Sequence, residues 1–430
     1  MLPLGPFEPA PALAVAVSGG ADSLALALCA RDWAAARGGS VLALVADHGL
    51  RAGSAAEAGL TRSRLRGAGI PAVALPLDLT RGPALAARAR DARYAALIEA
   101  AAARGILHLL LGHHAGDQAE TVLIRLLAAS RPAGLAGMAA LRETGPVRLL
   151  RPLLGVPPAR LRATLAAARL GWVDDPSNAD PRAARARIRA WRDDPGGTGA
   201  VTRRLGFEAA LAGRDRAGRE QTAAYALAAA AIRPEGFALL PGGPIAPDAL
   251  AALLRVVAGR RYAPAVDAVA ALAARPRPAT LGGARLLPAG RLGPGWLLLR
   301  EAAAMATPAP ARARAWDGRF RLTGWHDAGG DHTIGALGTD AARFRGDSDL
   351  PAVVVRTLPA LRRAGAVVAV PGIGVCAQPA YAGVRLVFAP EEAAAPALFL
   401  HVITENVEYG ARGDARCGED TYVDRRCGVG

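Results

Sequence analysis

A short glycine-rich segment near the N-terminus contains residue types that can bind phosphate. The sequence S-G-G-A-D-S occupies residues 18–23, between an apolar run at Leu13–Val17 and a predicted helix at Asp22–Arg37. Gly19 and Gly20 allow positive φ angles and a close approach of backbone N–H groups to a ligand. The serine hydroxyls and the amides of the helix N-terminus complete a phosphate cradle. The residues that we predict to hold phosphate are Ser18, Gly19, Gly20, Ala21, Asp22 and Ser23.

The aspartate in this cradle needs a physical reason, because a carboxylate and a phosphate repel each other. A bridging Mg²⁺ would supply that reason, since hard cations bind carboxylate oxygens. We therefore predict that Asp22 is a catalytic residue and an Mg²⁺ ligand. The alternative is a plain glycine turn in which Asp22 is an ordinary acid of the first helical turn.

A second polar segment, G-H-H-A-G-D-Q-A-E-T, occupies residues 112–121. His113, Asp117 and Glu120 are spaced i, i+4 and i+7, which predicts that they share one helix face. Two carboxylates one helical turn apart beside a phosphate site can bind Mg²⁺ or a cationic substrate amine. The alternative is that both acids are first-turn helix residues and that the histidines only pack. The apolar residues that we expect to face the core are Ala119, Leu123, Leu126 and Leu127.

Two weaker candidates also contain charged residues. Asp47 and His48 end the second predicted strand, where a nucleotide-binding sheet would place a base or ribose; the alternative is a simple turn. Arg90 and Arg93 are spaced i, i+3 on a predicted helix. This spacing suits contact with phosphate, and the alternative is a pair of surface salt bridges.

An arginine-rich run follows a loop that contains Trp172 and D-D-P-S-N at 174–178. Its spacing is close to one helix face and suits contact with a nucleic-acid backbone, whereas the alternative is a solvated surface. Its members are Arg182, Arg185, Arg187, Arg189 and Arg192.

Apolar runs and helical segments alternate through the first 130 residues, which predicts βαβ units and a parallel sheet. The predicted strands are Leu13–Val17, Val41–Ala46, Ala72–Leu75 and Ile106–Leu111. The predicted helices are Asp22–Arg37, Ser54–Gly67 (with a capping box of Ser54 and Glu57), Pro83–Ala103 and Ala115–Ala129. Ligands bind beyond the carboxyl ends of such strands. The two polar segments are therefore expected at one edge of the sheet.

The rest of the chain predicts further domains. We expect an α/β, Rossmann-like parallel-sheet domain at residues 1–195, a mainly helical domain at 200–300 and a small α+β domain at 316–430. Residues 201–275 are helical in pattern, and short strands are expected at 280–300. Glycine- or proline-rich linkers are expected at 196–199 and 301–315.

The composition excludes two classes of site. All 52 basic residues are arginine, so the chain has neither a Walker A lysine nor a lysine for Schiff-base chemistry. The net charge of +15 favours a nucleic-acid partner, although a genome-wide arginine bias would produce the same excess.

Cysteine usage and hydropathy bear on the compartment. Four cysteines, Cys29, Cys376, Cys417 and Cys427, form no C-x-x-C pair, which favours a reducing compartment over a disulfide framework. The N-terminus has no basic segment of the kind that opens a signal peptide, and no apolar run reaches the roughly 18 residues of a membrane helix. We expect a cytoplasmic protein with no membrane partner.

The motifs and their order resemble the PP-loop ATP-pyrophosphatases, and most closely the tRNA(Ile)-lysidine synthase family. Besides the segments at 18–23 and 112–121, the matching pieces are D-H-G-L-R at 47–51, A-R-D-A-R-Y at 89–94, P-A-G-L-A-G-M at 132–138, R-P-L-L at 151–154 and W-V-D-D-P-S-N at 172–178. They span about the first 190 residues. One stretch departs from the family pattern: Ala128–Arg131 stands where the family often has R-G-S/T-G.

The resemblance implies a two-step ligation. ATP adenylates O2 of the wobble cytidine (position 34) of tRNA(Ile) with a CAU anticodon, and pyrophosphate leaves. The ε-amine of free L-lysine then attacks C2, AMP departs, and lysidine is formed. By this resemblance residues 18–23, Asp47 and His48 bind ATP, Asp22 positions Mg²⁺, and the lysine and metal side is formed by His113, Asp117 and Glu120.

The tRNA contacts implied by the resemblance are Arg90, Arg93, Arg182, Arg185, Arg187 and Arg189, together with the middle and C-terminal domains. The resemblance also permits a homodimer. Two alternatives remain open. One is another PP-loop tRNA-modifying enzyme, such as a 2-thiolating enzyme, although only Cys29 lies in the catalytic half. The other is a non-catalytic RNA-binding protein.

Overall fold

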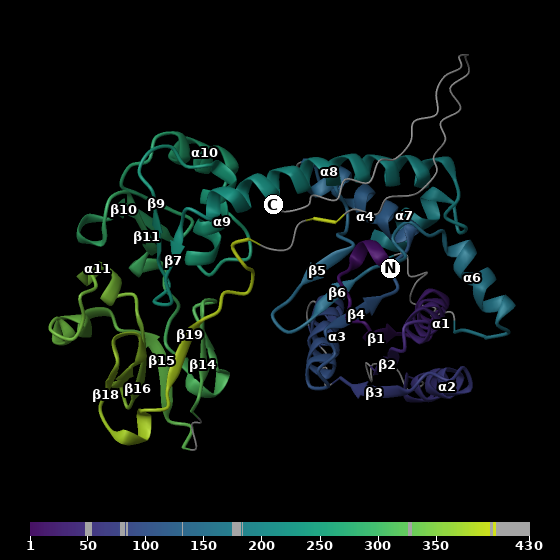
Figure 1. Ribbon diagram of the computed structural model, residues 1–430, viewed down its shortest axis with the longest axis horizontal. Helices are drawn as coiled ribbons and strands as arrows, with labels where there is room; N and C mark the ends of the chain where they lie inside the picture. The colour runs from purple at the N-terminus through teal and green to yellow at the C-terminus, as the bar shows by residue number, and fades with distance from the viewer. Residues whose placement is uncertain are drawn as a thin grey trace, which may run out of the picture.

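The N-terminal half is a twisted six-stranded sheet with helices on both faces (Figure 1). The computed structural model describes residues 1–47, 54–77, 82, 85–130, 132–173, 182, 184–325, 329–395 and 399–400. The strand order is β3-β2-β1-β4-β6-β5, and only β5 runs antiparallel to its neighbour. The strands are β1 (Ala12–Val17), β2 (Ser40–Asp47), β3 (Ala72–Pro76), β4 (His108–Leu111), β5 (Leu141–Glu143) and β6 (Arg148–Leu150).

The helices of this half divide between the two faces of the sheet. One face packs with α1, α2 and α6 around a core that includes Leu24, Leu65 and Leu165. The other face is covered by α3, which contributes Leu97 and Ala101 to a second core. The helices are α1 (Ala21–Ala35), α2 (Ser54–Gly67), α3 (Leu85–Ala102), α4 (Ala115–Leu127), α5 (Pro132–Leu135), α6 (Pro158–Ala167) and α7 (Ala184–Arg192).

The predicted α/β fold is confirmed, and the four predicted strands and helices occur in order with shifts of one or two residues at most ends. The register also places the two polar segments together. Ala16 of β1 pairs with Leu111 of β4, so the loops after both strands leave the same edge of the sheet. The hydroxyl of Ser54, expected in a capping box, donates to Asp47 Oδ1 at 2.7 Å.

The long helix α8 (Ala200–Leu227) joins the two halves of the molecule (Figure 1). At 1.5 Å per residue its 28 residues extend about 42 Å. Leu205 and Ala209, near its beginning, pack against Ala119 and Val122 of α4. Its end packs against α9 (Pro247–Val257) of the middle region.

The middle region combines helices with an antiparallel sheet. α9 and α10 (Val266–Ala274) pack on five strands in the order β7-β8-β11-β10-β9. The strands are β7 (Ala231–Ile232), β8 (Ala238–Leu240), β9 (Ala279–Leu281), β10 (Ala284–Pro288) and β11 (Trp296–Arg300). β7 and β8 lie inside the stretch predicted as helical, so that prediction was too broad. Pro234 and Gly236 lie in the turn between β7 and β8, and Gly236 adopts a φ of +87°.

The C-terminal region contains two small sheets. One has the order β12-β15-β16-β17-β18 and the other β13-β14-β19. Their elements are β12 (Ala309–Pro310), β13 (Ala315–Trp316), β14 (Phe320–Thr323), β15 (His332–Ala336), α11 (Ala352–Val355), β16 (Pro359–Arg363), β17 (Ala366–Val370), β18 (Val375–Cys376) and β19 (Arg385–Phe388). A buried ion-pair network holds this region to the end of β11: Asp317 accepts two hydrogen bonds from Arg300, both at 3.0 Å, and one from Arg319 at 2.8 Å.

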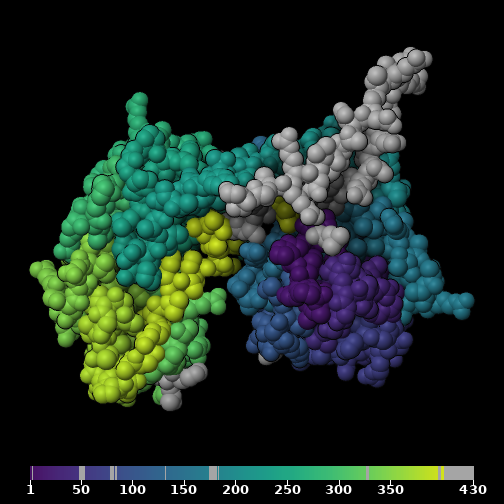
Figure 2. Space-filling model, viewed as in Figure 1, coloured from purple at the N-terminus to yellow at the C-terminus, as the bar shows by residue number. Residues whose placement is uncertain are grey.

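The chain after β19 returns to the N-terminal half. Glu392 forms an ion pair with Arg142 of β5 at 2.7 Å. The Phe399 amide donates to Glu220 of α8 at 2.8 Å, and the carbonyl of Leu400 accepts from Ala140 at 2.8 Å. This part of the predicted 316–430 domain therefore contacts the first domain. Figure 2 shows the two halves connected in the upper part of the view and separated by a gap lower down.

Candidate functional site

The glycine-rich segment forms the turn between β1 and α1. Gly19 has a φ of +88°, and a Cβ there would lie 2.5 Å from Thr61 Oγ1 of α2, so only glycine fits. Gly20 is the N-cap of α1 and leaves the first amides of the helix without a side-chain partner. The Val173 amide donates to the Gly19 carbonyl at 3.0 Å, which brings the chain before 174–178 against this loop.

The two serines of the loop have different surroundings. The Ser23 hydroxyl is buried; it donates to the Gly20 carbonyl at 2.9 Å and accepts from the Ser18 amide at 3.2 Å. Ser23 therefore braces the loop in its observed shape. Ser18 is exposed, with its hydroxyl 3.3 Å from that of Ser23, and is the serine available to a ligand.

The three predicted acids do not share one environment. Asp22 and Asp117 lie on either side of one imidazole: His114 Nε2 is 3.5 Å from Asp22 Oδ2 and 3.6 Å from Asp117 Oδ2. The other oxygen of Asp22, Oδ1, is buried and has no hydrogen-bond partner. Burial raises the pKa of Asp22; the negative charge of Asp117 adds to the rise, while His114 and Arg162 oppose it.

His114, which sequence reasoning missed, is the histidine of this cluster. It is the N-cap of α4, and its Nδ1 accepts from the amides of Gly116 at 3.0 Å and Asp117 at 3.4 Å. The Asp117 carboxylate accepts in return from the His114 amide at 3.1 Å. Because Nδ1 is an acceptor, the ring hydrogen is assigned to Nε2, which faces the two carboxylates. The signal in the sequence was the position of His114 directly before A-G-D, where a helix cap belongs.

The predicted helix face was wrong in detail, because α4 begins at Ala115, after both histidines. His113 precedes the helix and cannot share its face. Leu126 and Leu127, expected in the core, are 47% and 80% exposed. Glu120 is instead one of the most buried side chains of the helix, with no exposed surface.

Glu120 is enclosed by arginines from α7. Arg189 donates to both of its carboxylate oxygens, at 2.8 and 3.1 Å, in a bidentate pair. Arg185 and Arg192 approach it at 3.8 and 3.9 Å, and Arg192 also donates to the Gly116 carbonyl at 3.0 Å. In this structure Glu120 therefore anchors α7 on α4, and the position predicted for a substrate amine is taken by guanidinium groups.

The arginine run is consequently not a free basic face. Arg185 and Arg189 retain about 40% exposed side chains while they contact Glu120, and Arg189 lies 3.9 Å from Asp117. Arg187 donates to the carbonyl of Arg182 at 3.0 Å. Part of its positive charge is therefore neutralised by the acids of α4 and is not free to bind a backbone phosphate.

A second cationic group lies beside His113. Burial, the charge of Arg151 and, more weakly, that of Arg90 lower the pKa of His113 to about 3, so its ring is neutral at physiological pH. Arg151, from the R-P-L-L piece, is buried, and its Nε has no hydrogen-bond partner. Arg90 is exposed and lies over the ring of Tyr94 at 5.1 Å. The structure therefore brings Arg90 to the site. Burial lowers the pKa of Arg93. Its guanidinium carbon lies 6.0 Å from the centroid of the Tyr94 ring.

Two remaining predictions concern the outer edge of the site. Asp47 ends β2 at the expected sheet edge and accepts from Ser54. His48 and the D-D-P-S-N segment lie outside the described residues. The 132–138 loop is fixed from α4: Gln118 accepts from the Met138 amide at 2.8 Å, and Arg125 donates to the Gly137 carbonyl at 2.7 Å.

The donor set fits a magnesium ion held mainly by a substrate. Within the described residues no group of three or more His, Cys, Asp or Glu side chains is arranged to hold a metal. Asp22 Oδ1, buried and without a partner, is a suitable single carboxylate ligand. Mg²⁺ commonly uses one or two carboxylates and takes its other ligands from phosphates and water. The glycine loop that begins four residues earlier is where such phosphates would lie.

No helix in the described part of the chain is both long enough and apolar enough to cross a membrane.

Comparison with known proteins gives one family. The PP-loop domain matches residues 4–191. The tRNA(Ile)-lysidine synthase of Rhodopseudomonas palustris is 46% identical over 186 residues, which are 43% of this chain and 54% of that protein. The synthase of a Methylobacterium species is 44% identical over 290 residues, 64% of this chain and 78% of that relative. A solved structure of the U34-tRNA thiolase NcsA from Methanococcus maripaludis aligns with a TM-score of 0.39 at 17% identity, over 48% of this chain and 75% of that one.

The chain spans only 54% to 60% of the length of the first relatives that it matches. Its match to the Methylobacterium protein extends past the PP-loop domain into the regions beyond α8. From this match and from the glycine loop, His114 and the acids of α4, the chain belongs to the tRNA(Ile)-lysidine synthase family.

Proposed function

We propose that the chain is an ATP-dependent ligase that joins L-lysine to C2 of the wobble cytidine of tRNA(Ile) with a CAU anticodon. The products would be lysidine, AMP and pyrophosphate. The observation that carries the proposal is the position of Asp22. Its carboxylate follows a loop that only glycine can form, it has one buried oxygen without a partner, and it lies across His114 from Asp117. An anion cradle and acids that attract cations thus meet at one sheet edge.

The loop would bind the phosphates of ATP. The amides at the start of α1 and the Ser18 hydroxyl would donate to phosphate oxygens, and the helix dipole would favour their negative charge. Ser23 would keep the loop in shape through its bonds to Ser18 and Gly20. Asp47, at the end of β2, would lie toward the nucleoside. Mg²⁺, held by Asp22 Oδ1 and phosphate oxygens, would neutralise the charge that develops on pyrophosphate.

The acids at the start of α4 would receive the ammonium group of lysine. Asp117 is 16% exposed, carries no bidentate partner and faces the Nε2 hydrogen of His114, so it is the better-placed first contact. Glu120 would become available only if Arg189 moved away from it. The neutral ring of His113 would add no positive charge that repels the incoming amine.

Arginine side chains at the edge of the site would orient the tRNA. Arg90 is exposed near His113, and Arg185 and Arg189 are partly exposed beside the acids of α4. These positions suit contacts with phosphates on either side of a wobble nucleotide. We place the enzyme in the cytoplasm, where its tRNA, ATP and lysine occur together.

Sulfur transfer is less well supported. Cys29 lies within α1, and burial together with the nearby charge of Asp32 raises the pKa of its thiol. A raised pKa lowers the thiolate fraction that sulfur chemistry requires. The observation thus favours an amine nucleophile over a cysteine-bound sulfur.

The test is incorporation of radiolabelled lysine into tRNA, with ATP and magnesium, followed by identification of the labelled nucleoside. Label at the wobble cytidine with release of AMP and pyrophosphate is the expected result. The Asp22→Asn variant should lose this activity. The matched control is Asp32→Asn, which removes an exposed acid from the same helix and should retain it.

Two outcomes would overturn the proposal. ATP consumption stimulated by tRNA, without lysine label, would keep the PP-loop chemistry and assign another nucleophile. Intact tRNA binding without any ATP turnover would assign a non-catalytic RNA-binding role.

A further inference from the structure

A second basic surface lies in the middle region, away from the site. Between residues 255 and 300 there are eight arginines and a single acid, Asp267. Arg300 is bound to Asp317, and Arg255 faces the negative charge of Glu392. The other arginines are exposed and form no ion pair with the described residues: Arg260, Arg261, Arg275, Arg277, Arg285 and Arg291.

This surface differs from the arginine run of α7. In α7, Arg185, Arg189 and Arg192 converge on one buried glutamate. The six exposed arginines of the middle region form no ion pair within the described part of the chain. Unpaired arginines repel one another, and a polyanion that binds them removes that cost.

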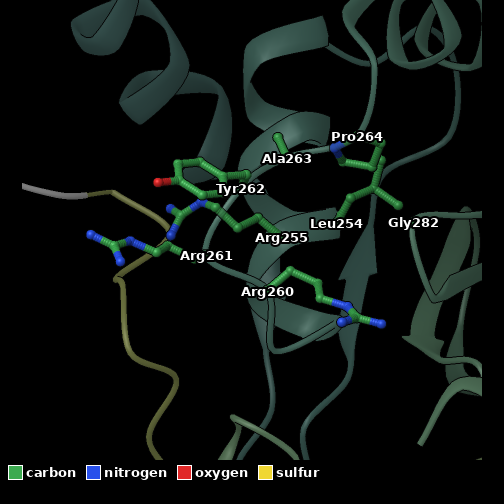
Figure 3. A pocket seen from close by; sticks show the side chains of 8 residues that line it. All are labelled: Leu254, Arg255, Arg260, Arg261, Tyr262, Ala263, Pro264 and Gly282. Atoms are coloured by element: carbon green, nitrogen blue, oxygen red, sulfur yellow. The ribbon is translucent and has the colours of Figure 1, made fainter. Parts of the chain in front are cut away.

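A pocket opens within this surface beside the end of α9 (Figure 3). Its cavity measures about 520 Å³, and it is lined by Leu254, Arg255, Arg260, Arg261, Tyr262, Ala263, Pro264 and Gly282. Figure 3 shows Arg260 and Arg261 extending in different directions, with Tyr262 beside Arg255. The volume falls within the range of sites that enclose small ligands.

An aromatic side chain stands at the mouth of this pocket. Tyr262 is 76% exposed, and the Arg261 guanidinium carbon lies 5.7 Å from its ring centroid. Arg255 is anchored from behind by its hydrogen bond to the Ala393 carbonyl at 2.6 Å. An exposed ring close to arginines offers a stacking platform for a base, and the arginines offer forked donors for the adjoining phosphates.

We propose that this pocket binds an unpaired nucleotide of the tRNA, with the base stacked on Tyr262 and the flanking phosphates held by Arg260 and Arg261. The proposal rests on the proposed function, because it takes the polyanion to be tRNA. The combination of a ring with guanidinium groups favours RNA over an acidic protein, which would need the charges but not the stacking surface.

The test is the salt dependence of tRNA binding by the full chain. An in vitro transcript of tRNA(Ile) with a CAU anticodon is titrated by fluorescence anisotropy between about 50 and 200 mM salt. Arg260→Ala/Arg261→Ala should weaken binding about tenfold or more and reduce the slope of log K against log salt by about one per arginine. Tyr262→Ala should weaken binding roughly 5- to 100-fold with an unchanged slope, and Tyr262→Phe should bind like the original chain.

The matched control is Arg37→Ala/Arg104→Ala. Both arginines are exposed, and they follow α1 and α3 at the opposite edge of the sheet from the site. Thermal unfolding of every variant verifies that it is folded. The proposal would be overturned if the double variant at 260 and 261 bound tRNA like this control, or if Tyr262→Ala had no effect on binding. It would also be overturned if the original chain did not bind tRNA. Because binding is measured without catalysis, a chain that binds as expected but makes no lysidine would overturn the proposed function alone.

Discussion

Two clusters of acids and arginines in this molecule differ in how completely their charges are paired. At the junction with the C-terminal region, Asp317 is 2% exposed and accepts from Arg300, Arg319 and the Ala306 amide. At the sheet edge, Asp22 is 35% exposed and has one buried oxygen without a partner. An acid whose two oxygens are both hydrogen-bonded stabilises a fold, whereas an acid with an unsatisfied oxygen is available to a ligand.

The pKa directions follow the same division. Despite burial, the hydrogen bond from Arg300 and the charge of Arg319 hold the pKa of Asp317 below its usual value. Burial raises the pKa of Asp22 because its neighbours do not compensate for lost water. Glu120 combines features of both cases: it lies on α4 near Asp117, yet it is buried and enclosed by three arginines. Charge clusters are therefore better distinguished by the pairing of each oxygen than by composition.

The largest effect should follow the loss of the unpaired carboxylate. Asp22→Asn should lower lysine incorporation by about 10²- to 10³-fold, because an amide neither attracts Mg²⁺ as a carboxylate does nor offsets charge on the leaving group. The variant should remain folded, since the contact between Asp22 and His114 is long, at 3.5 Å, and the other Asp22 oxygen has no partner to lose. Initial rates at saturating ATP measure the effect. A variant with more than a tenth of the original rate would remove Asp22 from the catalytic site.

Breaking the paired cluster should instead destabilise the fold. Asp317→Ala leaves Arg300 and Arg319, which are 3% and 0% exposed, without a partner. The expected loss is about 3 to 5 kcal/mol of unfolding free energy, measured by urea denaturation. The control is Glu208→Gln, which removes an exposed pair with Arg204 and should change stability by less than about 0.5 kcal/mol. Equal losses in both variants would contradict the distinction drawn from pairing.

Glu120→Gln should combine both kinds of effect. The amide keeps the shape of the side chain but leaves Arg192, 3% exposed, beside a neutral group. Arg185 and Arg189 are partly exposed and can turn toward water, so the expected loss of about 2 to 3 kcal/mol is smaller than at Asp317. If Glu120 also receives lysine after Arg189 moves, KM for lysine should rise. A stability loss with an unchanged lysine KM would make Glu120 an anchor of α7 only.

The sequence predicted the parts of the site that depend on local order. Apolar runs bounded by glycine located β1 and β4, and the parallel arrangement then placed Asp22 and Asp117 at one edge. The helix-face argument failed because it included His113, which lies before the first residue of the helix, Ala115. His114 therefore replaced His113 in the cluster, and the buried face moved from Leu127 to Glu120. The position of a cap decides such details, and hydropathy alone does not encode it.

The sequence patterns did not predict contacts between distant parts of the chain. The partners of Glu120 are 65 to 72 residues further along, and a run of arginines looks the same whether it binds an acid or a phosphate. The return of Phe399 and Leu400 to α8 and β5 likewise depends on the assembled fold. Alanine-rich composition hid β7 and β8, because alanine favours helices locally while tertiary packing selects the strand.

The smallest expected effect concerns the pH dependence of stability, and its sign differs between the two clusters. The folded pKa of Asp317 is lowered, so its contribution is present above the unfolded value and is lost as the pH falls through the folded pKa. The folded pKa of Asp22 is raised, so its ionised form costs stability as the pH rises above the unfolded value. Asp22→Asn should therefore stabilise the chain near neutral pH, by no more than about 1 kcal/mol because solvent screens a partly exposed group.

This gain should shrink as the pH falls to values at which the Asp22 carboxyl is protonated in both states. Asp317→Asn should lower the free energy of unfolding near neutral pH, whereas Asp22→Asn should raise it. The loss at Asp317 should also shrink as the pH becomes acidic. Chemical denaturation of the original chain and both variants, from about pH 7 down to about pH 2, measures the two differences. If the change in unfolding free energy followed the same pH dependence in both variants, Asp22 would be paired in solution. An unpaired oxygen would then not distinguish a ligand site from a structural network.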